Sequence, residues 1–399
     1  MVSRTSGPTA SASRLRGALE DFIAAWLRGE APPWSFVDEP EAVKEVLARG
    51  RYHGILALLD ARRRAEPEGA ADWPEPLAGA CRDAALGQTM WELRHQARLM
   101  EVMSRLGALG VVPILFKGTA LAYTLYPDGA FRTRGDTDLL VPRGAEARLW
   151  PLLEQLGYRR SVGLAGEGVG YEACWSRREA DGSSHALDVH WRLCNAEVLA
   201  DLVTYDELLS RAVPIPALGP TARAASHLDA LLIACVHRAR HVLSPYHVDG
   251  EAHLGGDRMI WLYDFHLLAS SFSEERWSEF VVAARHKGMS GVCLEGLEQA
   301  RARFGTILPD EVVTQLGSAA ASEPLTRYFA SGQLRQHWAN FVAIHGMQAR
   351  ARFLSVAFFP PEEHMRAKFP QGGWLPWLYL RRAVAGFYRL VAPARPSMR

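Results

Sequence analysis

The chain has 399 residues, 48% of them hydrophobic and 22% charged, a composition typical of a globular protein with a sizeable core. Its formal net charge of +1 excludes a strong overall attraction to nucleic acid or anionic lipid, although it leaves room for a local basic patch. The five cysteines are scattered, without metal-finger spacing, so we expect reduced thiols and a cytoplasmic protein. No apolar stretch is long enough to cross a bilayer, and no membrane insertion is expected.

The first quarter of the chain predicts helices. Residues 1–14 are small and polar, and we expect them to be disordered. Beyond them, apolar side chains recur every three or four positions, as on one face of a helix. The clearest run, which should pack into the core, consists of Leu86, Met90, Leu93, Ala97, Met100, Met103 and Leu106. Residues 15–106 are therefore predicted to form an N-terminal helical region.

Residues 107–215 show a different pattern. An apolar strand is predicted at 111–116, followed by a short helix, a loop and a second strand at 137–141. Residues 185–193 alternate strictly between apolar and polar, which predicts a third strand. Helical spacing returns over residues 216–399. The expected fold class is α+β, a small mixed β-sheet core flanked by N-terminal and C-terminal helical regions.

The sequence GDTDLLV carries the sharpest chemical signal. Asp136 and Asp138 lie two positions apart at the start of a predicted strand, so both side chains project from one face. Carboxylates that close repel each other unless a cation or a proton lies between them, and Mg²⁺ or Mn²⁺ bound together with substrate phosphates is the natural partner. Asp188, on another predicted strand, is the candidate third carboxylate, as metal ligand or as general base toward an acceptor hydroxyl. The structural alternatives are an exposed turn at the pair and a solvated strand face at Asp188.

The sequence FKGTAL places Lys117, one of only four lysines in a chain with 41 arginines, directly after the first predicted strand. If Gly118 and Thr119 begin a helix there, their N–H groups and the threonine hydroxyl can hold nucleotide phosphates. Lys117 would add positive charge; the alternative is a lysine directed to solvent. Arg132 and Arg134 suit bidentate contact with phosphate or pairing with the aspartates, and we favour phosphate for Arg132.

The segments FKGTAL, RTRGDTDLLV and LDVHWRL together resemble the uncharacterised nucleotidyltransferase family of the polymerase-beta-like superfamily. They are also similar to the abortive-infection nucleotidyltransferase toxins. The superfamily pattern is a helix-starting Gly-Ser or Gly-Gly, then Asp-x-Asp, then a third aspartate on a later strand. This chain matches it with threonine in place of serine, and the residues that match are Gly118, Thr119, Asp136, Asp138 and Asp188. The gap before Asp-x-Asp is longer than in the polymerase-like pattern, as it is in the toxin-like branches.

The resemblance extends over about residues 45–390 and implies an enzyme that moves a nucleoside monophosphate from an NTP, such as ATP, to an acceptor hydroxyl, releasing pyrophosphate. It also implies Mg²⁺ or Mn²⁺ as cofactor. The acceptor is open: a small molecule is favoured, and tRNA or a protein would fit the same donor site, because such catalysis depends on positioning and charge neutralisation. The alternative is a toxin-type or non-catalytic relative that acts on or binds tRNA or a protein partner. Intact carboxylates at all three positions favour catalysis.

Two histidines raise a rival hypothesis. His237 and His241, spaced i, i+4 on a predicted helix, can place two imidazoles on one metal, as in a hydrolase. Further candidate ligands for such a site follow at His247, Asp249, His253 and Asp257. The sequence contains no HExxH motif, however. We therefore favour a cleft between the core and the C-terminal helices, lined by His190, His237 and His241, with Trp261 packed nearby and an ion pair between Arg258 and Asp264.

The segment WLPWLYLRRAVAGFYRLV, near the C-terminus, is both apolar and basic. This pattern fits a helix that lies on a membrane surface or a final amphipathic helix packed on the core. The near-zero net charge of the whole chain favours packing.

Overall fold

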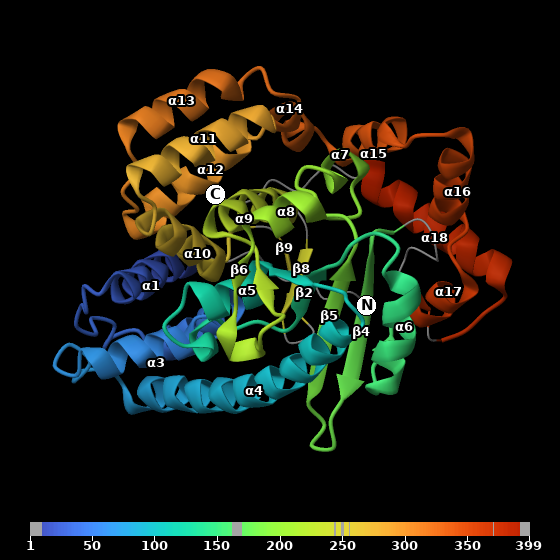
Figure 1. Cartoon of the computed structure of the whole chain (residues 1–399). Coiled ribbons are helices and arrows are strands. Elements are labelled where there is room, and N and C mark those ends of the chain that lie inside the picture. Colours follow the sequence, from blue (N-terminus) through green and yellow to red (C-terminus); the bar gives the residue numbers. More distant parts are fainter. Residues whose placement is uncertain are drawn as a thin grey trace.

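A computed structural model of the chain describes residues 10–161, 170–242, 245–248, 251–254, 256–369 and 371–391. At its centre lies a seven-stranded mixed sheet in the order β3-β4-β5-β2-β1-β7-β6, with helices around it (Figure 1). The predicted α+β class is confirmed. Helix α1 (Ala10–Arg28) begins inside the segment 1–14 that the sequence predicts to be disordered; residues 1–9 lie outside the described part.

The three predicted strands form the middle of the sheet. They are β1 (Ile114–Phe116), β2 (Thr137–Leu140) and β5 (Ser184–His190). β1 is shorter than predicted, since Pro113 has no N–H to donate to a neighbouring strand. β2 pairs antiparallel with β1 and parallel with β5.

The outer strands are less evident in the sequence. β4 (Glu172–Arg178) and β3 (Arg159–Arg160) continue the sheet beyond β5, while β7 (Arg223–Ala224) and β6 (Val213–Pro214) continue it beyond β1. β7 lies past residue 215, the predicted end of the α/β core. A separate two-stranded sheet consists of β8 (Pro245–Val248) and β9 (Glu251–Leu254).

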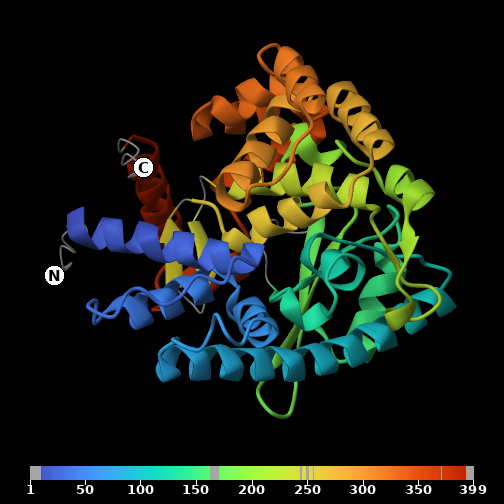
Figure 2. The same ribbon diagram turned by 90° about the vertical axis from the view of Figure 1, so that its left-hand side faces the viewer.

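The two helical regions share one core although the sheet separates them in sequence. The N-terminal helices after α1 are α2 (Ala42–His53), α3 (Leu56–Ala65) and α4 (Glu75–Ala108). They pack with α9 (His227–His241), α10 (Met259–Ser270), α11 (Glu274–His286), α12 (Ser290–Phe304), α13 (Asp310–Ala320) and α14 (Pro324–Ala330). Trp26, Ile260 and Leu297, from three distant parts of the chain, are fully buried in this common cluster. Figure 2 shows both sets of helices beside the sheet.

Different helices cover the two faces of the sheet. Leu139, Leu187 and Val189 face the C-terminal half of α4 and α6 (Glu146–Gln155). On the other face, Phe116 and Leu140 pack with residues of α8 (Tyr205–Arg211) and α9. Because strand residues alternate between faces, Asp138 and Asp188 belong to this second face.

Helix α4 departs from the sequence prediction. Its C-terminal residues Met103 and Leu106 are buried, as expected, but Met90 and Met100 are 56% and 44% exposed. The prediction that the whole apolar run packs into the core is therefore wrong. The side that faces the molecule at mid-helix instead carries Glu92 and His95, both buried and both hydrogen-bonded to the loop and strand around the acidic pair.

The C-terminal helices extend along one side of the sheet (Figure 1). They are α15 (Gln333–Ala343), α16 (Met347–Phe358), α17 (Glu362–Lys368) and α18 (Leu375–Val391). α15 contacts the short helix α7 (Glu197–Ala200), where the Val198 N–H donates to Asn340 Oδ1 over 3.1 Å. Among the described residues, no helix is long and apolar enough to cross a membrane.

Candidate active site

Parallel pairing of β2 with β5 brings Asp138 and Asp188 to directly adjacent positions. One carboxylate oxygen from each and one ring nitrogen of His190 all lie within 4.8 Å of one another. Asp138 and His190 are buried, and Asp188 is partly exposed. Two of the carboxylates that the sequence predicts for one metal therefore lie together on the side of the sheet opposite α4.

His190 lies in direct contact with Asp138 of β2, whereas the sequence predicted only that it lines a cleft. Its Nε2 is 3.1 Å from Asp138 Oδ1, and its Nδ1 is 3.3 Å from an oxygen of Glu172, which is its cross-strand neighbour on β4. Glu172 was not among the predicted site residues. For His190, the sequence did carry a signal: the alternation of β5 places it on the same strand face as Asp188.

Lys117 binds the same carboxylate. Its Nζ donates to Asp138 Oδ1 over 2.6 Å, so its charge is paired within the acidic cluster. Burial by itself would lower the pKa of Lys117, but the charge of Asp138 outweighs it and the pKa is raised. For Asp138, burial is likewise opposed by Lys117 and His190, and its pKa is lowered. Both groups are therefore held in their charged forms.

The pKa of Asp136 is shifted in the opposite direction to that of Asp138. It lies just before β2, and much of the residue is exposed. Loss of water around its carboxyl group, followed by the charges of Asp138 and Asp188, raises its pKa to about 7. Asp136 is not one of the three residues whose donor atoms lie within 4.8 Å of one another. The charges of Asp138 and Asp188 nevertheless act on its carboxyl group, and a cation placed between them would relieve this repulsion.

Asp188 also has a raised pKa, chiefly because of burial, although a hydrogen bond with Cys174 acts in the other direction. Cys174 is its cross-strand neighbour on β4 and is exposed, whereas the other four cysteines are buried. A carboxylate with a raised pKa is a better proton acceptor, which suits a general base.

The first turn of α5 (Lys117–Thr124) begins beside these carboxylates. Lys117 has φ 57°, a left-handed conformation that is uncommon for a residue with a side chain. Phe116, the N-cap, supplies no side-chain hydrogen bond to the turn. The buried Thr119 hydroxyl lies 3.1 Å from the carbonyl oxygen of Asp136, to which it can donate, so it ties α5 to the start of β2.

Arg132 and Arg134 are held in internal ion pairs. Arg132 is buried and binds Asp264 of α10 through Nε and Nη2, the shortest contact being 2.7 Å. Arg134 binds Glu92 of α4 at 2.8 Å. Asp264 thus pairs with Arg132, where the sequence suggested Arg258; the Arg258 Nε donates to a main-chain oxygen of α2. These pairs fix the loop before Asp136 between two helices, and a contact of either arginine with phosphate stays a prediction.

Residues 39–305 of the chain match a protein family described as uncharacterised nucleotidyltransferase. The chain belongs to this family. No curated protein matches the chain. The matched residues include the whole sheet, the acidic cluster and α9 to α12, whereas α15 to α18 lie beyond them.

The donor set of the acidic cluster fits a divalent cation. Mg²⁺ is held by carboxylate oxygens and phosphates at about 2.0–2.1 Å and keeps several waters, and Asp138 and Asp188 can supply such oxygens from adjacent strands. His190 touches Asp138 and fits the role of an outer partner that orients a ligating carboxylate. As a direct ligand, its imidazole would favour a transition metal over Mg²⁺.

His237 and His241 form a second group near the cluster. Their rings lie 4.4 Å apart, and the Trp261 ring meets that of His237 edge-on at 5.2 Å. Burial lowers the pKa of both histidines, that of His241 to about 4, and the charge of Lys117 adds to the effect. Of the other predicted hydrolase ligands, Asp249 lies outside the described residues, as do the side chains of His247 and His253, and Asp257 pairs with Arg238.

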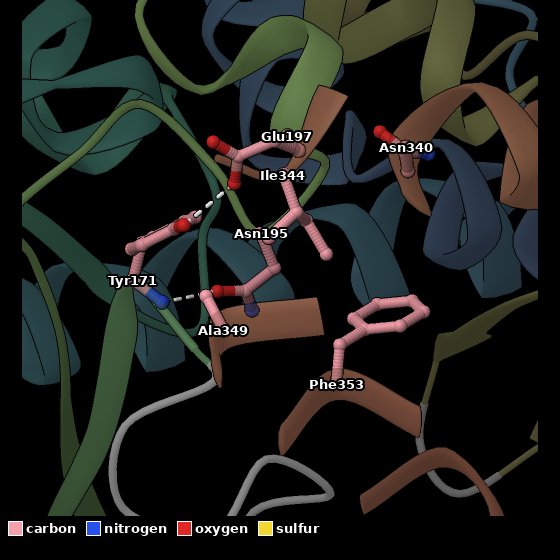
Figure 3. Close-up of a pocket in the computed structure, with 7 residues that line it drawn as sticks. All are labelled: Tyr171, Asn195, Glu197, Asn340, Ile344, Ala349 and Phe353. Atoms are coloured by element: carbon pink, nitrogen blue, oxygen red, sulfur yellow. Dashed lines mark hydrogen bonds between the residues drawn. The ribbon is translucent and has the colours of Figure 1, made fainter. Parts of the chain in front are cut away.

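A pocket lies between the edge of the sheet and the C-terminal helices (Figure 3). One wall consists of Tyr171, Asn195 and Glu197, and the other of Asn340, Ile344, Ala349 and Phe353. Asn195 joins the pocket to the cluster, since its Nδ2 donates to Glu172 over 2.7 Å and Glu172 contacts His190. The wall from α15 and α16 lies beyond the residues that match the family.

Proposed function

We propose that the chain is a metal-dependent enzyme that transfers a nucleoside monophosphate from an NTP to an acceptor hydroxyl. The observation that carries the proposal is the adjacent placement of Asp138 and Asp188 on parallel strands, with Asp136 directly before the first of these strands. Membership of a nucleotidyltransferase family supports it. A divalent cation, when bound to these carboxylates, would neutralise the charge of the phosphates.

The transfer requires one bond to form and one to break. The acceptor oxygen attacks the α-phosphorus, the bond between that phosphorus and the bridging oxygen to the β-phosphorus breaks, and pyrophosphate leaves with the bonding electrons. The proton of the acceptor hydroxyl passes to a carboxylate. Asp188 suits this task because burial raises its pKa and because its strand neighbour is Asp138.

The triphosphate has a place at the first turn of α5. The main-chain N–H groups of Gly118 and Thr119 begin this helix and attract anions. A Cβ at Gly118 would lie 3.6 Å from Arg132 Nη1, so the guanidinium group is within reach of an anion at the turn. Lys117, released from Asp138 when a cation binds there, would become available to the same phosphates.

For the acceptor we propose a small hydroxyl-bearing molecule in the pocket of Figure 3. The pocket combines a carboxylate and two amides with the apolar side chains of Ile344 and Phe353, a mixture that suits a small molecule with one polar and one apolar face. The contacts of Asn195 with Glu172 and of Glu172 with His190 connect the wall of the pocket to the acidic cluster.

The test is incubation of the purified chain with each α-³²P-labelled NTP, Mg²⁺ or Mn²⁺, and a cell extract that is then separated into small molecules, RNA and protein. Label in the small-molecule fraction, lost in the Asp138→Asn variant, is the expected result. Label on tRNA or protein would replace the proposed acceptor with that of the toxin-type alternative. The absence of label and of pyrophosphate with all four NTPs would overturn the transfer reaction itself.

A further inference from the structure

The helices α15 to α18 expose side chains that the rest of the chain keeps inside. Trp338, Trp374 and Trp377 are 66%, 76% and 57% exposed, whereas each of the nine preceding tryptophans is buried or partly buried. Eleven of the twenty exposed large apolar side chains in the described part of the chain lie between Leu334 and Val384. Exposed apolar surface of this extent marks an interaction site.

Helix α18 shows which side faces outward. Leu378 is buried, and Arg382, one turn later, donates to a main-chain oxygen of α16 over 2.7 Å, so this side of α18 faces the molecule. The side chains at positions i, i+3 and i+7 on the opposite side are all exposed: Trp377, Leu380 and Val384. α18 is therefore amphipathic, with its apolar face turned away from the protein.

The neighbouring helices contribute in the same way. In α15 and α16 no described side chain is fully buried. Their exposed apolar residues are Leu334, Trp338, Val342, Met347, Leu354 and Phe358. Indole, phenyl and aliphatic groups are thus mixed on this surface, as on helices that lie in the interfacial layer of a membrane.

The positive charge of the chain is concentrated in the same C-terminal segment that carries these exposed apolar side chains. Residues 331–399 contain ten arginines and lysines against two glutamates, a net charge of +8, while residues 1–330 have a net charge of −7. The near-neutral total therefore conceals a strongly basic C-terminal segment. A surface that is both basic and apolar matches the two properties of an anionic bilayer, whose headgroups attract arginine and whose outer hydrocarbon layer accepts indole and aliphatic groups.

We propose that α15 to α18 dock the chain on the surface of a membrane that contains anionic lipids. Membrane contact explains the exposed leucine, valine and methionine side chains, for which the phosphates of a nucleic acid offer no partner. The association is peripheral, because no described helix could cross the bilayer. The docking surface lies outside the family match at residues 39–305, so this proposal does not depend on the transfer reaction.

The test is co-sedimentation of the full chain with extruded vesicles. Vesicles of phosphatidylcholine with about one third phosphatidylglycerol should bind at least about tenfold more protein than phosphatidylcholine alone, and raising NaCl to about 0.5 M should release most of it. The variant Trp374→Ser/Trp377→Ser should lose most of the binding, with a smaller blue shift of tryptophan fluorescence. The matched control is Met90→Ser/Leu93→Ser, which removes two apolar side chains of α4 that are also more than half exposed and should bind as the parent does.

Three results would overturn the proposal. They are equal binding to neutral and anionic vesicles, unchanged binding of the tryptophan variant, and complete release of the protein from vesicles by an equal mass of tRNA. The last result would assign the surface to nucleic acid. Circular dichroism of the double variants confirms that they fold, and the transfer assay in solution reports on the active site separately.

Discussion

At the residue scale, the pairing of Lys117 with Asp138 gives the lone lysine of FKGTAL its role in the metal-free protein. A left-handed φ of 57° at a residue with a side chain costs on the order of 1 kcal/mol. In this conformation the Lys117 ammonium group lies 2.6 Å from Asp138 Oδ1. It therefore occupies the position beside the carboxylate that a metal cation would need. Lys117 and a divalent metal are therefore expected to compete for Asp138.

Replacing Lys117 by methionine tests this competition. Without nucleotide, Lys117→Met should bind Mn²⁺ about tenfold more tightly, a change of about 1.4 kcal/mol, measured by electron paramagnetic resonance of free Mn²⁺. With nucleotide, the loss of a charge-assisted phosphate contact, worth about 1.5–3 kcal/mol, should raise the NTP requirement roughly ten- to a hundredfold. Lys117→Arg keeps the positive charge, so its Mn²⁺ affinity and its NTP requirement should both lie between those of the parent and those of Lys117→Met. Unchanged or weaker Mn²⁺ binding by the methionine variant would contradict the competition.

The two aspartates of GDTD should respond in opposite ways to replacement by asparagine. Asp138→Asn leaves Lys117 without its partner and should lower the free energy of unfolding by about 2–3 kcal/mol. Asp136→Asn removes a carboxyl group whose pKa is raised to about 7, and should stabilise the metal-free protein by about 1 kcal/mol once screening by solvent is allowed for.

The sign for Asp136 follows from its raised pKa. Between pH 3.8 and 7 the folded state retains a proton that the unfolded state has released, so this group destabilises the fold increasingly as pH rises through that range. The gain from Asp136→Asn should therefore be present above pH 7 and vanish below about pH 4. Both variants should lose transfer activity. If Asp136→Asn and Asp138→Asn melt at the same temperature at pH 8, the opposite electrostatic roles assigned to the two aspartates are refuted.

At the element scale, the strands could be predicted more fully than the contacts between helices. Alternation in β5 placed Asp188 and His190 on one face, and the apolar run after Asp138 gave β2. The apolar run of α4 was predicted too, but not which side faces inward. Glu92 and His95 lie on the inner side because they bind the loop and the strand around Asp136. Such pairs join residues 42 positions apart in sequence, and no local pattern reports them.

The pair of Arg134 with Glu92 should hold that loop against α4. The two groups lie 2.8 Å apart, with side-chain exposures of 2% and 9%, and Tyr123 also donates to Glu92. Arg134→Met alone should cost about 3–5 kcal/mol, because it leaves a buried carboxylate without its cation. The double variant Arg134→Met/Glu92→Leu should recover a large part of this loss.

A double-mutant cycle by urea unfolding measures the coupling. Arg82→Met is the matched control, since Arg82 pairs with Glu75 on the exposed surface of the same helix, and it should cost less than about 1 kcal/mol. Additive losses for Arg134 and Glu92 would mean that the pair does not act as a unit.

At the scale of the whole molecule, helices from both ends of the chain form one core, which the sequence could not reveal. The predicted regions 15–106 and 216–399 contribute to a single cluster of buried residues. His53 of α2 shows how closely they join, because its Nδ1 accepts a hydrogen bond from the N–H of Met259 at the start of α10, 206 positions away. Local periodicity identifies each helix, but the packing of distant helices depends on complementary surfaces that periodicity does not describe.

Histidines buried in this joint structure should make its stability depend on pH. Burial lowers the pKa of His53 and of His185 to about 4, from an ordinary value of 6.5. Between these values the unfolded state binds protons that the folded state excludes, so stability is lost as pH falls from 6.5 toward 4. Each histidine should account for about 2 kcal/mol of loss between pH 7 and pH 5.

Urea unfolding of His185→Gln should therefore show a shallower decline of stability than the parent over this range, although the lost contact with Tyr158 lowers its stability at pH 7. His286→Gln, at an exposed position on α11, should decline as the parent does. If His185→Gln keeps the full decline of the parent, the acid sensitivity arises elsewhere, and the buried imidazole of His185 is protonated in the folded protein.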